Sequence, residues 1–246
     1  MSRFVVLSGP SCIGKGPLCK ALQKFYPDFS SRFHRLVFYD SRAPRPGEQE
    51  GVDFYFRTRR FIEDLREKED YLVIEYRGDM LAVNFVDMKK LLKEGDVFFE
   101  GNPLVAKALL DLCANEGIEH LSIFLSPLSK EEIRYVQSPE KHVDLGDFVT
   151  DVMRRKLLRR TQKQKTILSA KDLENIEIRV SHAISEMILA HHFDHVIPNH
   201  DGEDSDNWDA FYYPIADARK TLLCLVEIIR GESSSYCEKW PRKLLH

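Results

Sequence analysis

The sequence predicts an α/β fold in which helices cover both faces of a parallel β-sheet, giving three layers. Short apolar stretches of strand length alternate along the chain with amphipathic stretches of helix length, which is typical of a parallel sheet with crossover helices. The first apolar stretch, residues 4–8 (FVVLS), leads into a glycine-rich loop, and a helical pattern follows over residues 17–25. No internal repeat interrupts this order. Together these observations favour one large α/β domain.

The remaining elements follow from the same two periodicities. Pro17 suits the first turn of a helix, where its missing N–H costs little, and Gly95 marks a helix end. Residues 33–56 hold short strand-like pieces around a turn-rich centre. In chain order we then expect a helix at 59–69, a strand at 71–77, a helix at 84–95, a strand at 96–100, a helix up to about 117, a strand at 120–126, helices at 146–167 and 173–192, a strand at 194–199 and a helix at 216–231.

Composition excludes several classes of protein. The net charge of −3 over 246 residues argues against a nucleic-acid partner, and no apolar run reaches the length of a membrane span. Five scattered cysteines without a C-x-x-C pair indicate free thiols in a reducing, cytoplasmic setting. His191, His192 and His195 cluster without the spacing of a metal site, so we expect no metal ligands among them.

Two segments look loosely ordered. Residues 200–209 (HDGEDSDNWD) are acidic and rich in turn formers, either as a regulatory or partner-binding loop or, as we favour, as a solvated insertion. Residues 232–246 are polar, and we expect a flexible tail there.

The glycine-rich loop has the spacing of a phosphate-binding loop. Gly9, four further residues and Gly14-Lys15 lie between a buried strand and a helix, which is the context that such a loop requires. Backbone N–H groups and the helix dipole would then attract phosphate, and the lysine would reach the β and γ phosphates. The expected nucleotide-binding residues are Gly9, Ser11, Cys12, Ile13, Gly14, Lys15 and Gly16. Gly16 stands where a Ser or Thr hydroxyl usually binds magnesium.

A second segment adds a resemblance. Residues 41–56 (SRAPRPGEQEGVDFYF), with SGPS-x-x-GK earlier in the chain, resemble the guanylate kinase family. The resemblance implies transfer of the ATP γ-phosphate to GMP, and a P-loop fold with a small monophosphate-binding lobe and a helical lid. On this basis the core comprises 1–32, 96–145 and 193–231, the acceptor-binding lobe 33–95, and the lid with its helices 146–192.

The same resemblance assigns roles to arginines. Arg42 and Arg45 correspond to the two arginines that hold the acceptor phosphate, which suits the bidentate fork of a guanidinium. Arg160 and Arg179 correspond to lid arginines that stabilise the transferring phosphoryl group. With Lys15 they complete the expected catalytic set, although several arginines between 154 and 160 compete for the first lid position.

The departures from the family concern recognition of the acceptor base. Phe38 replaces a serine, and Phe54 replaces a tyrosine whose phenol would hold the acceptor phosphate. Glu75 lies near the position of the guanine-reading carboxylate, but only with a shift of alignment. An enzyme selects a base through buried polar partners, so the loss of these partners lowers selectivity for guanine. We therefore expect the acceptor to be GMP or another phosphorylated small molecule. Arg42, Arg45, Phe54 and Glu75 are the expected substrate-binding residues.

Magnesium and Cys12 leave alternatives open. Adenylate kinases also carry glycine after the lysine, so the resemblance implies Mg²⁺ held largely through water, with Glu100 as a possible protein partner. Cys12 stands where the family usually has glycine, either as a thiol of lowered pKa or, as we favour, as a tolerated small residue. A non-catalytic module and a generic nucleotide-regulated P-loop protein remain as alternatives to the kinase.

Overall fold

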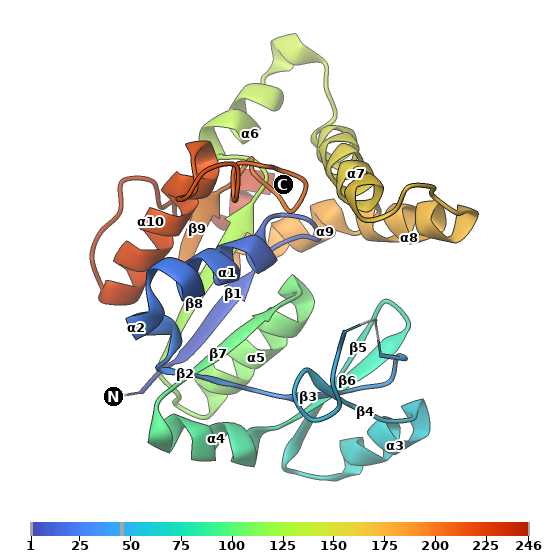
Figure 1. The fold of residues 1–246 in the computed structure, drawn as a ribbon, viewed down its shortest axis with the longest axis vertical. Helices are drawn as coiled ribbons and strands as arrows, with labels where there is room; N and C mark the ends of the chain where they lie inside the picture. The colour runs from blue at the N-terminus through green and yellow to red at the C-terminus, as the bar shows by residue number, and fades with distance from the viewer. Residues whose placement is uncertain (1, 45–46, 246) are drawn as a thin grey trace. The chain divides into compact units, whose positions relative to one another are not determined.

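The computed structural model describes residues 2–44 and 47–245, and the chain divides into two compact units (Figure 1). The first unit comprises residues 1–5, 32–99 and 104–121. The second comprises residues 6–31, 100–103 and 122–246. The glycine-rich loop and the expected lid therefore belong to the second unit, and the segment around Arg42 belongs to the first.

The main sheet confirms the predicted parallel α/β core. Its order is β2-β7-β1-β8-β9, and both β2 with β7 and β8 with β9 run parallel. The strands are β1 (Phe4–Ser8), β2 (Phe33–Arg35), β7 (Asp96–Gly101), β8 (His120–Ser126) and β9 (His195–Pro198). All five residues of β1 are buried, as its uninterrupted apolar sequence predicts.

A second, four-stranded sheet lies in the first unit, in the order β4-β3-β6-β5. Its strands are β3 (Phe38–Asp40), β4 (Phe54–Phe56), β5 (Tyr71–Tyr76) and β6 (Asp79–Asn84). We did not predict β6. It forms an antiparallel hairpin with β5 through Arg77 and Gly78, both at positive φ, without the Asn-Gly pair that usually signals such a turn.

The longer helices cover the ranges expected from periodicity, apart from two exceptions explained below. The short helical segments at residues 27–30, 139–141 and 242–245 were not predicted either. In the first unit lie α3 (Arg59–Asp64), η1 (Leu65–Glu67), α4 (Phe85–Glu94) and most of α5 (Pro103–Asn115). In the second unit lie α1 (Lys15–Phe25), α2 (Pro27–Ser30), α6 (Lys130–Val136), η2 (Pro139–Lys141), α7 (Leu145–Gln164), α8 (Ala170–Val180), α9 (Ala183–Ile188), η3 (Leu189–His192), α10 (Ala216–Arg230) and η4 (Arg242–Leu245).

The exceptions have local causes. The prediction of one helix over 173–192 was wrong, because the chain breaks after α8, where the Ser181 hydroxyl and the His182 ring both contact the backbone oxygen of Ile178. Helix α6 was missed, although Ser129 and Glu132 form a capping box at its start.

The expectation of a flexible tail was wrong for residues 232–245. Glu238 pairs with Val196 of β9 as an antiparallel bridge, with both backbone hydrogen bonds at 2.8 Å. The Trp240 side chain is buried, and its indole N–H donates to the Glu238 carboxylate. The segment therefore extends the second unit as an ordered strap, defined here as residues 234–245. In the described part of the chain no helix is both long and apolar enough to cross a membrane.

Candidate nucleotide-binding site

The glycine-rich loop connects β1 to α1, and two of its glycines cannot carry a side chain. Gly9 has φ 146°, and a Cβ there would lie 2.4 Å from the backbone oxygen of Leu125. Gly14 has φ 100°, and its Cβ would lie 2.6 Å from the Asn199 side-chain nitrogen. Both positions require glycine for conformation as well as for space. This is the tight strand-to-helix turn of a P-loop.

Lys15 is held over this loop at the start of α1. Its Nζ donates to the backbone oxygens of Gly9 at 2.8 Å and Pro10 at 2.9 Å, and the residue is 8% exposed. An ammonium has three donors, so these two bonds leave one for an anion. The lysine is thus a positioned point charge at the mouth of the loop.

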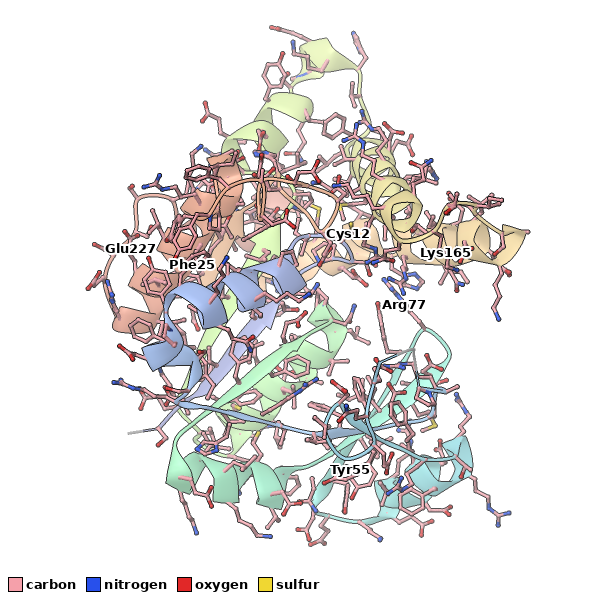
Figure 2. The ribbon with its side chains drawn as sticks, viewed as in Figure 1. Cys12, Phe25, Tyr55, Arg77, Lys165 and Glu227 are labelled. Carbon is pink, nitrogen blue, oxygen red and sulfur yellow. The ribbon has the colours of Figure 1, made fainter. Side chains whose placement is uncertain are left out.

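Cys12 is not an activated thiol. The residue is buried and has φ 68°, a conformation that non-glycine residues seldom adopt. Burial first, and then the nearby Glu203 carboxylate, raise the pKa of Cys12 to about 12. The alternative of a lowered pKa at the helix N-terminus is therefore wrong. Figure 2 marks Cys12 in the loop between β1 and α1.

Residues after β9 hold the phosphate loop in place. The Asn199 amide donates to the backbone oxygens of Ile13 at 2.7 Å and of Asp201 at 2.8 Å. The Trp208 indole donates to the Asp201 backbone oxygen at 2.8 Å. A Cβ on Gly202 would lie 2.1 Å from the backbone oxygen of Cys12. We did not predict this contact, although loops at the carboxyl ends of parallel strands commonly meet at a ligand site.

The acidic segment is consequently not the solvated insertion that we favoured. Asp201, Asp204 and Trp208 are all buried. Asp204 faces cations of α7, with 3.7 Å between its Oδ1 and Lys156 Nζ and 4.0 Å between its Oδ2 and Arg159. Glu203 Oε2 and Asp204 Oδ1 are buried without a hydrogen-bond partner among the described residues. Two carboxylates beside the P-loop thus have unused acceptor capacity.

Helix α7 distributes its arginines among different partners. Arg154 pairs with Glu177 of α8 at 2.8 Å, and Arg155 pairs with Asp151 one turn earlier. Arg160 is close enough to Cys12 for its charge to lower the pKa of that thiol, against the larger effect of burial, and its Nε lacks a hydrogen-bond partner in the described chain. The structure therefore brings Arg160 to the phosphate loop. Arg179 lies half-buried in the last turn of α8.

A cavity of about 910 Å³ opens beside this region, entirely within the second unit. It is lined on one side by α7 and on the other by the segment after β9. Its charged and titratable lining includes Glu132, Arg155, Lys156, Arg159, His200 and Asp204. A cavity of this volume is in the range of small-molecule sites.

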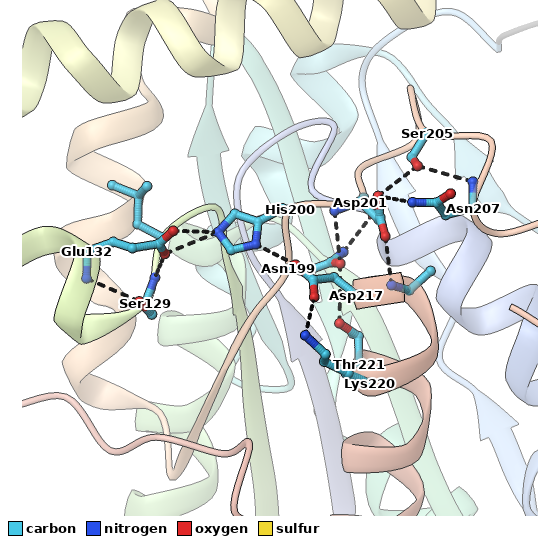
Figure 3. A network of polar contacts seen from close by, with 12 residues as sticks. Ser129, Glu132, Asn199, His200, Asp201, Ser205, Asn207, Asp217, Lys220 and Thr221 are labelled. Carbon is cyan, nitrogen blue, oxygen red and sulfur yellow. Dashed lines mark hydrogen bonds and ion pairs between the residues drawn. The ribbon is translucent and has the colours of Figure 1, made fainter. Parts of the chain in front are cut away.

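His200 joins three elements at the edge of the cavity (Figure 3). Its Nε2 lies 2.9 Å from Glu132 of α6, and its Nδ1 contacts Asp217 of α10. Burial lowers the pKa of His200, but the two carboxylates outweigh it, so the net pKa is raised. Lys156 also donates to the backbone oxygen of His200. The His200 ring therefore ties the acidic segment to α6 and α10.

In the first unit, Arg42 is already paired. Its guanidinium is bidentate to Glu48, with both N–O distances at 2.7 Å, and its Nε lies 3.1 Å from Asp40. The pKa of Arg42 is raised, mainly by the bond to Glu48. Its Cζ atom lies 4.9 Å from the centre of the Phe54 ring, so these two expected substrate-binding residues do come together. Arg45, the second expected phosphate arginine, lies outside the described residues.

Glu75 has a different partner from the one a base-reading carboxylate would need. It is exposed on β5 and pairs with Arg59 at 2.6 Å. This bond, and then the charge of Arg59, lower the pKa of Glu75. Tyr55, labelled in Figure 2, packs against Tyr39 with ring centres 5.0 Å apart and the ring planes tilted by 33°. The Glu75–Arg59 pair and the Tyr55–Tyr39 contact therefore do not connect Glu75 with Arg42.

The residues near the loop fit a magnesium ion that binds together with substrate phosphates, rather than one held by the protein alone. No group of three or more His, Cys, Asp or Glu side chains capable of holding a metal occurs in the described ranges. Glu100 is exposed at the end of β7, and a Cβ on Gly16 would meet nothing within 4 Å. The unpartnered oxygens of Glu203 and Asp204 are of the type that Mg²⁺ accepts. Magnesium commonly uses few protein ligands, together with water and substrate phosphates.

Fold and loop together define a P-loop α/β protein, with Lys15 held at the loop by two backbone oxygens. The sequence profile of the guanylate kinase family matches residues 1–143, more than half of the chain. The chain belongs to the guanylate kinase family.

Individual relatives agree with this assignment. A guanylate kinase of Synechococcus sp. (strain JA-3-3Ab) is 37% identical over 133 residues, which are 53% of this chain and 58% of that protein. A guanylate kinase of Bacillus cereus is 33% identical over 160 residues, or 63% and 70% of the two chains. The chain thus spans less than two thirds of the Synechococcus protein. The crystal structure of guanylate kinase from Anaplasma phagocytophilum has the same fold, with a TM-score of 0.54 and 18% identity over 96% of this chain and 89% of that one.

Proposed function

We propose that this protein is an ATP-dependent phosphotransferase that moves the γ-phosphate of ATP to GMP or another nucleoside monophosphate. The observation that carries the proposal is Lys15, held by two backbone oxygens at the mouth of a P-loop with one donor left for phosphate. The relatives named above are guanylate kinases, which supports the same reaction class.

The donor nucleotide would bind in the second unit. Backbone N–H groups of residues 11–16 and Lys15 would hold its phosphates. The cavity beside α7 is large enough for the nucleoside. Arg160, close to Cys12, would stabilise the charge of the transferring group, and Arg179 would act with it.

Magnesium would bind with the donor phosphates, mostly through water, because Gly16 has no hydroxyl. It would neutralise phosphate charge. Positioning and electrostatics supply most of the rate in such a transfer, since an acceptor phosphate needs no strong general base.

The acceptor monophosphate would bind in the first unit. Arg42 and Arg45 would hold its phosphate, and Phe54 contributes an apolar face without the phenol of the family. Glu75 remains a proposed base contact, available only if its pair with Arg59 opens. The paired state of Arg42 is the observation that favours the second candidate, a non-catalytic binding module.

ADP release from MgATP, measured with GMP, AMP, CMP, UMP and dTMP in turn, tests the proposal. We expect turnover with at least one acceptor, and loss of activity when EDTA removes magnesium. Lys15→Ala should lower kcat/KM by about 10²-fold or more, as loss of a transition-state donor does. If MgATP binds but none of the five acceptors gives ADP, the binding module replaces the kinase.

The proposed cellular location of the protein rests on its free cysteines. All five cysteines are free in the structure, which supports a reducing, cytoplasmic location. A small phosphorylated acceptor is the expected partner.

A further inference from the structure

The face of α7 that lines the cavity changes in character along the helix. Phe148 and Val152, near its start, are apolar, and the later lining residues are mostly cationic, namely Arg155, Lys156, Arg159 and Lys163. Their spacing of three, four or seven positions places them on one side of the helix. The cavity therefore has an apolar end and a cationic end along α7.

The apolar end is completed by the loop between β8 and α6. Pro127 and Leu128 of this loop are buried and line the same cavity, whereas Phe148 and Val152 are half-buried. Among the described residues that line the cavity, Phe148 is the one aromatic side chain. A half-buried aromatic ring suits stacking on a planar base, and the apolar walls suit packing around that base.

The cationic end lies towards the phosphate loop. Arg160, the residue after Arg159, is close enough to Cys12 for its charge to act on that thiol. Lys156 lies 3.7 Å from Asp204, which belongs to the segment that packs against the phosphate loop. A nucleotide whose phosphates occupy the loop would therefore have its base at the apolar end of the cavity.

The polar side chains around the cavity are mostly committed to one another. The Ser205 hydroxyl and the Asn207 amide donate to the Asp201 carboxylate at 2.8 and 2.9 Å (Figure 3). Both ring nitrogens of His200 contact carboxylates. Gln162, the other amide side chain on the described lining, is exposed to solvent. The cavity therefore offers a base apolar contact and little recognition by hydrogen bonds.

We propose that the apolar end holds the base of the donor nucleotide, that Phe148 is its stacking residue, and that adenine and guanine triphosphates are both accepted. This inference rests on the proposed function, which places the donor in the second unit. A site built to hydrogen-bond its ligand rejects a mismatched analogue by about 10⁴-fold or more, whereas an apolar pocket discriminates by about 10²-fold at most. Stacking tolerates both purines, because every base has a π-face.

Calorimetric titration of the full-length protein with MgATP, MgGTP and magnesium tripolyphosphate tests the proposal. We expect the two nucleotides to differ in affinity by less than about tenfold, and MgGTP to displace MgATP from the same site. Phe148→Ala should weaken both nucleotides by about tenfold, the usual cost of losing one stacked ring. Tripolyphosphate has no base, so its affinity should stay unchanged in this variant.

Further variants separate stacking from support of the fold. Phe148→Tyr keeps the ring and should retain the native affinities. Phe148→Leu keeps most of the apolar volume and should weaken the nucleotides several-fold, which serves as the test if the alanine variant does not fold. Tyr135→Ala removes an exposed aromatic residue of α6 outside the cavity lining, and this matched control should bind both nucleotides as the native protein does.

The outcomes distinguish this inference from the proposed function. A preference of more than about 10²-fold for one purine triphosphate would overturn the inference, since such strict reading needs hydrogen bonds. An equal loss of tripolyphosphate affinity in Phe148→Ala would overturn it too, because the ring would then only support the fold, and so would a failure of both nucleotides to bind. Turnover with MgATP but not MgGTP would leave the proposed function in place without the inference. Similar binding of both nucleotides without transfer to any acceptor would keep the inference and remove the kinase.

Discussion

The two units differ in how tightly their carboxylates pair with the cations proposed to bind phosphate. In the first unit, Arg42 makes a bidentate pair with Glu48 at 2.7 Å and a further contact with Asp40. In the second unit, Lys156 and Arg159 lie 3.7 and 4.0 Å from Asp204. A charge-assisted bidentate pair is strong, whereas ion pairs near 4 Å without a hydrogen bond are weak. Under the proposed function, an acceptor phosphate would have to displace a carboxylate from Arg42. The carboxylate of Asp204 would compete much less for Lys156 and Arg159, although Lys156 also donates to the His200 backbone oxygen.

The largest effects should come from removing one arginine from each unit. Arg42→Ala should raise the KM for the acceptor, and Arg160→Ala should mainly lower kcat. Each should lower kcat/KM by about 10²- to 10³-fold, the usual cost of one transition-state or phosphate contact. Steady-state kinetics with the acceptor and MgATP varied separately checks this division. Arg134→Ala, exposed on α6, is the control.

Equal effects of both variants on both substrates would contradict the division of roles. So would an unchanged KM for the acceptor in Arg42→Ala, since the guanidinium would then serve only its internal pair.

Glu48→Gln sharpens the comparison next. It removes the carboxylate charge that holds Arg42, while Asp40 still positions the Nε atom. We expect the acceptor monophosphate to bind several-fold to about tenfold more tightly, because it no longer competes with a bidentate carboxylate. Isothermal titration without ATP measures the affinity directly. Glu63→Gln, in an exposed pair with Arg66, is the matched control. Weaker binding in Glu48→Gln would show that the carboxylate positions Arg42 more than it competes.

The sequence predicted the helices and strands of both units better than it predicted ion pairs such as Arg42–Glu48. The apolar runs and amphipathic periods located every strand of the main sheet except the short β2, which fell within a stretch described only as strand-like. They missed β6 because its turn, Arg77-Gly78, lacks the usual signal, and they missed the capping box that starts α6. Periodicity reports which side of an element is buried, so regular elements are the part it predicts well.

The site was predictable as far as local motifs reach. The phosphate loop and Lys15 follow from one contiguous pattern, and Arg42 and Glu48 lie in another. That these two residues bind each other, or that Asn199 holds Ile13, depends on tertiary contacts that no spacing encodes. The acidic segment shows this most clearly. Its charge predicted solvation, but packing against the P-loop buries Asp204 and Trp208.

Asp204→Asn should have a smaller effect than Glu48→Gln. The charge removed lies at 3.7 to 4.0 Å from its cations and makes no hydrogen bond through Oδ1. We expect the affinity for ATP without magnesium to rise about two- to threefold, in line with the small energies of such pairs. Asp209→Asn, in the same segment but exposed and outside the cavity lining, is the control. A fall in affinity that appears only when magnesium is present would assign Asp204 to the metal instead.

The smallest expected effect is a pH dependence confined to the second unit. The carboxylates of Glu132 and Asp217 raise the pKa of His200 on folding, against the effect of burial, while Lys156 contacts its backbone oxygen and Arg155 and Arg159 line the same cavity. A raised pKa in the folded state contributes stability that is complete below the unfolded value, near 6.5, and is lost as the pH rises through the folded value.

His200→Gln should therefore lower Tm by a few degrees at pH 6, and the difference from the parent protein should shrink towards pH 8.5. His120→Gln, whose ring contacts a backbone oxygen and not a carboxylate pair, should show no such trend. The Arg42 guanidinium stays charged over this range. The His200→Gln substitution should therefore leave acceptor affinity unchanged, whereas it should change ATP affinity in a pH-dependent way. A pH-independent Tm difference would reduce His200 to a neutral hydrogen-bonding group, and an equal pH dependence of both affinities would remove the distinction between the two units.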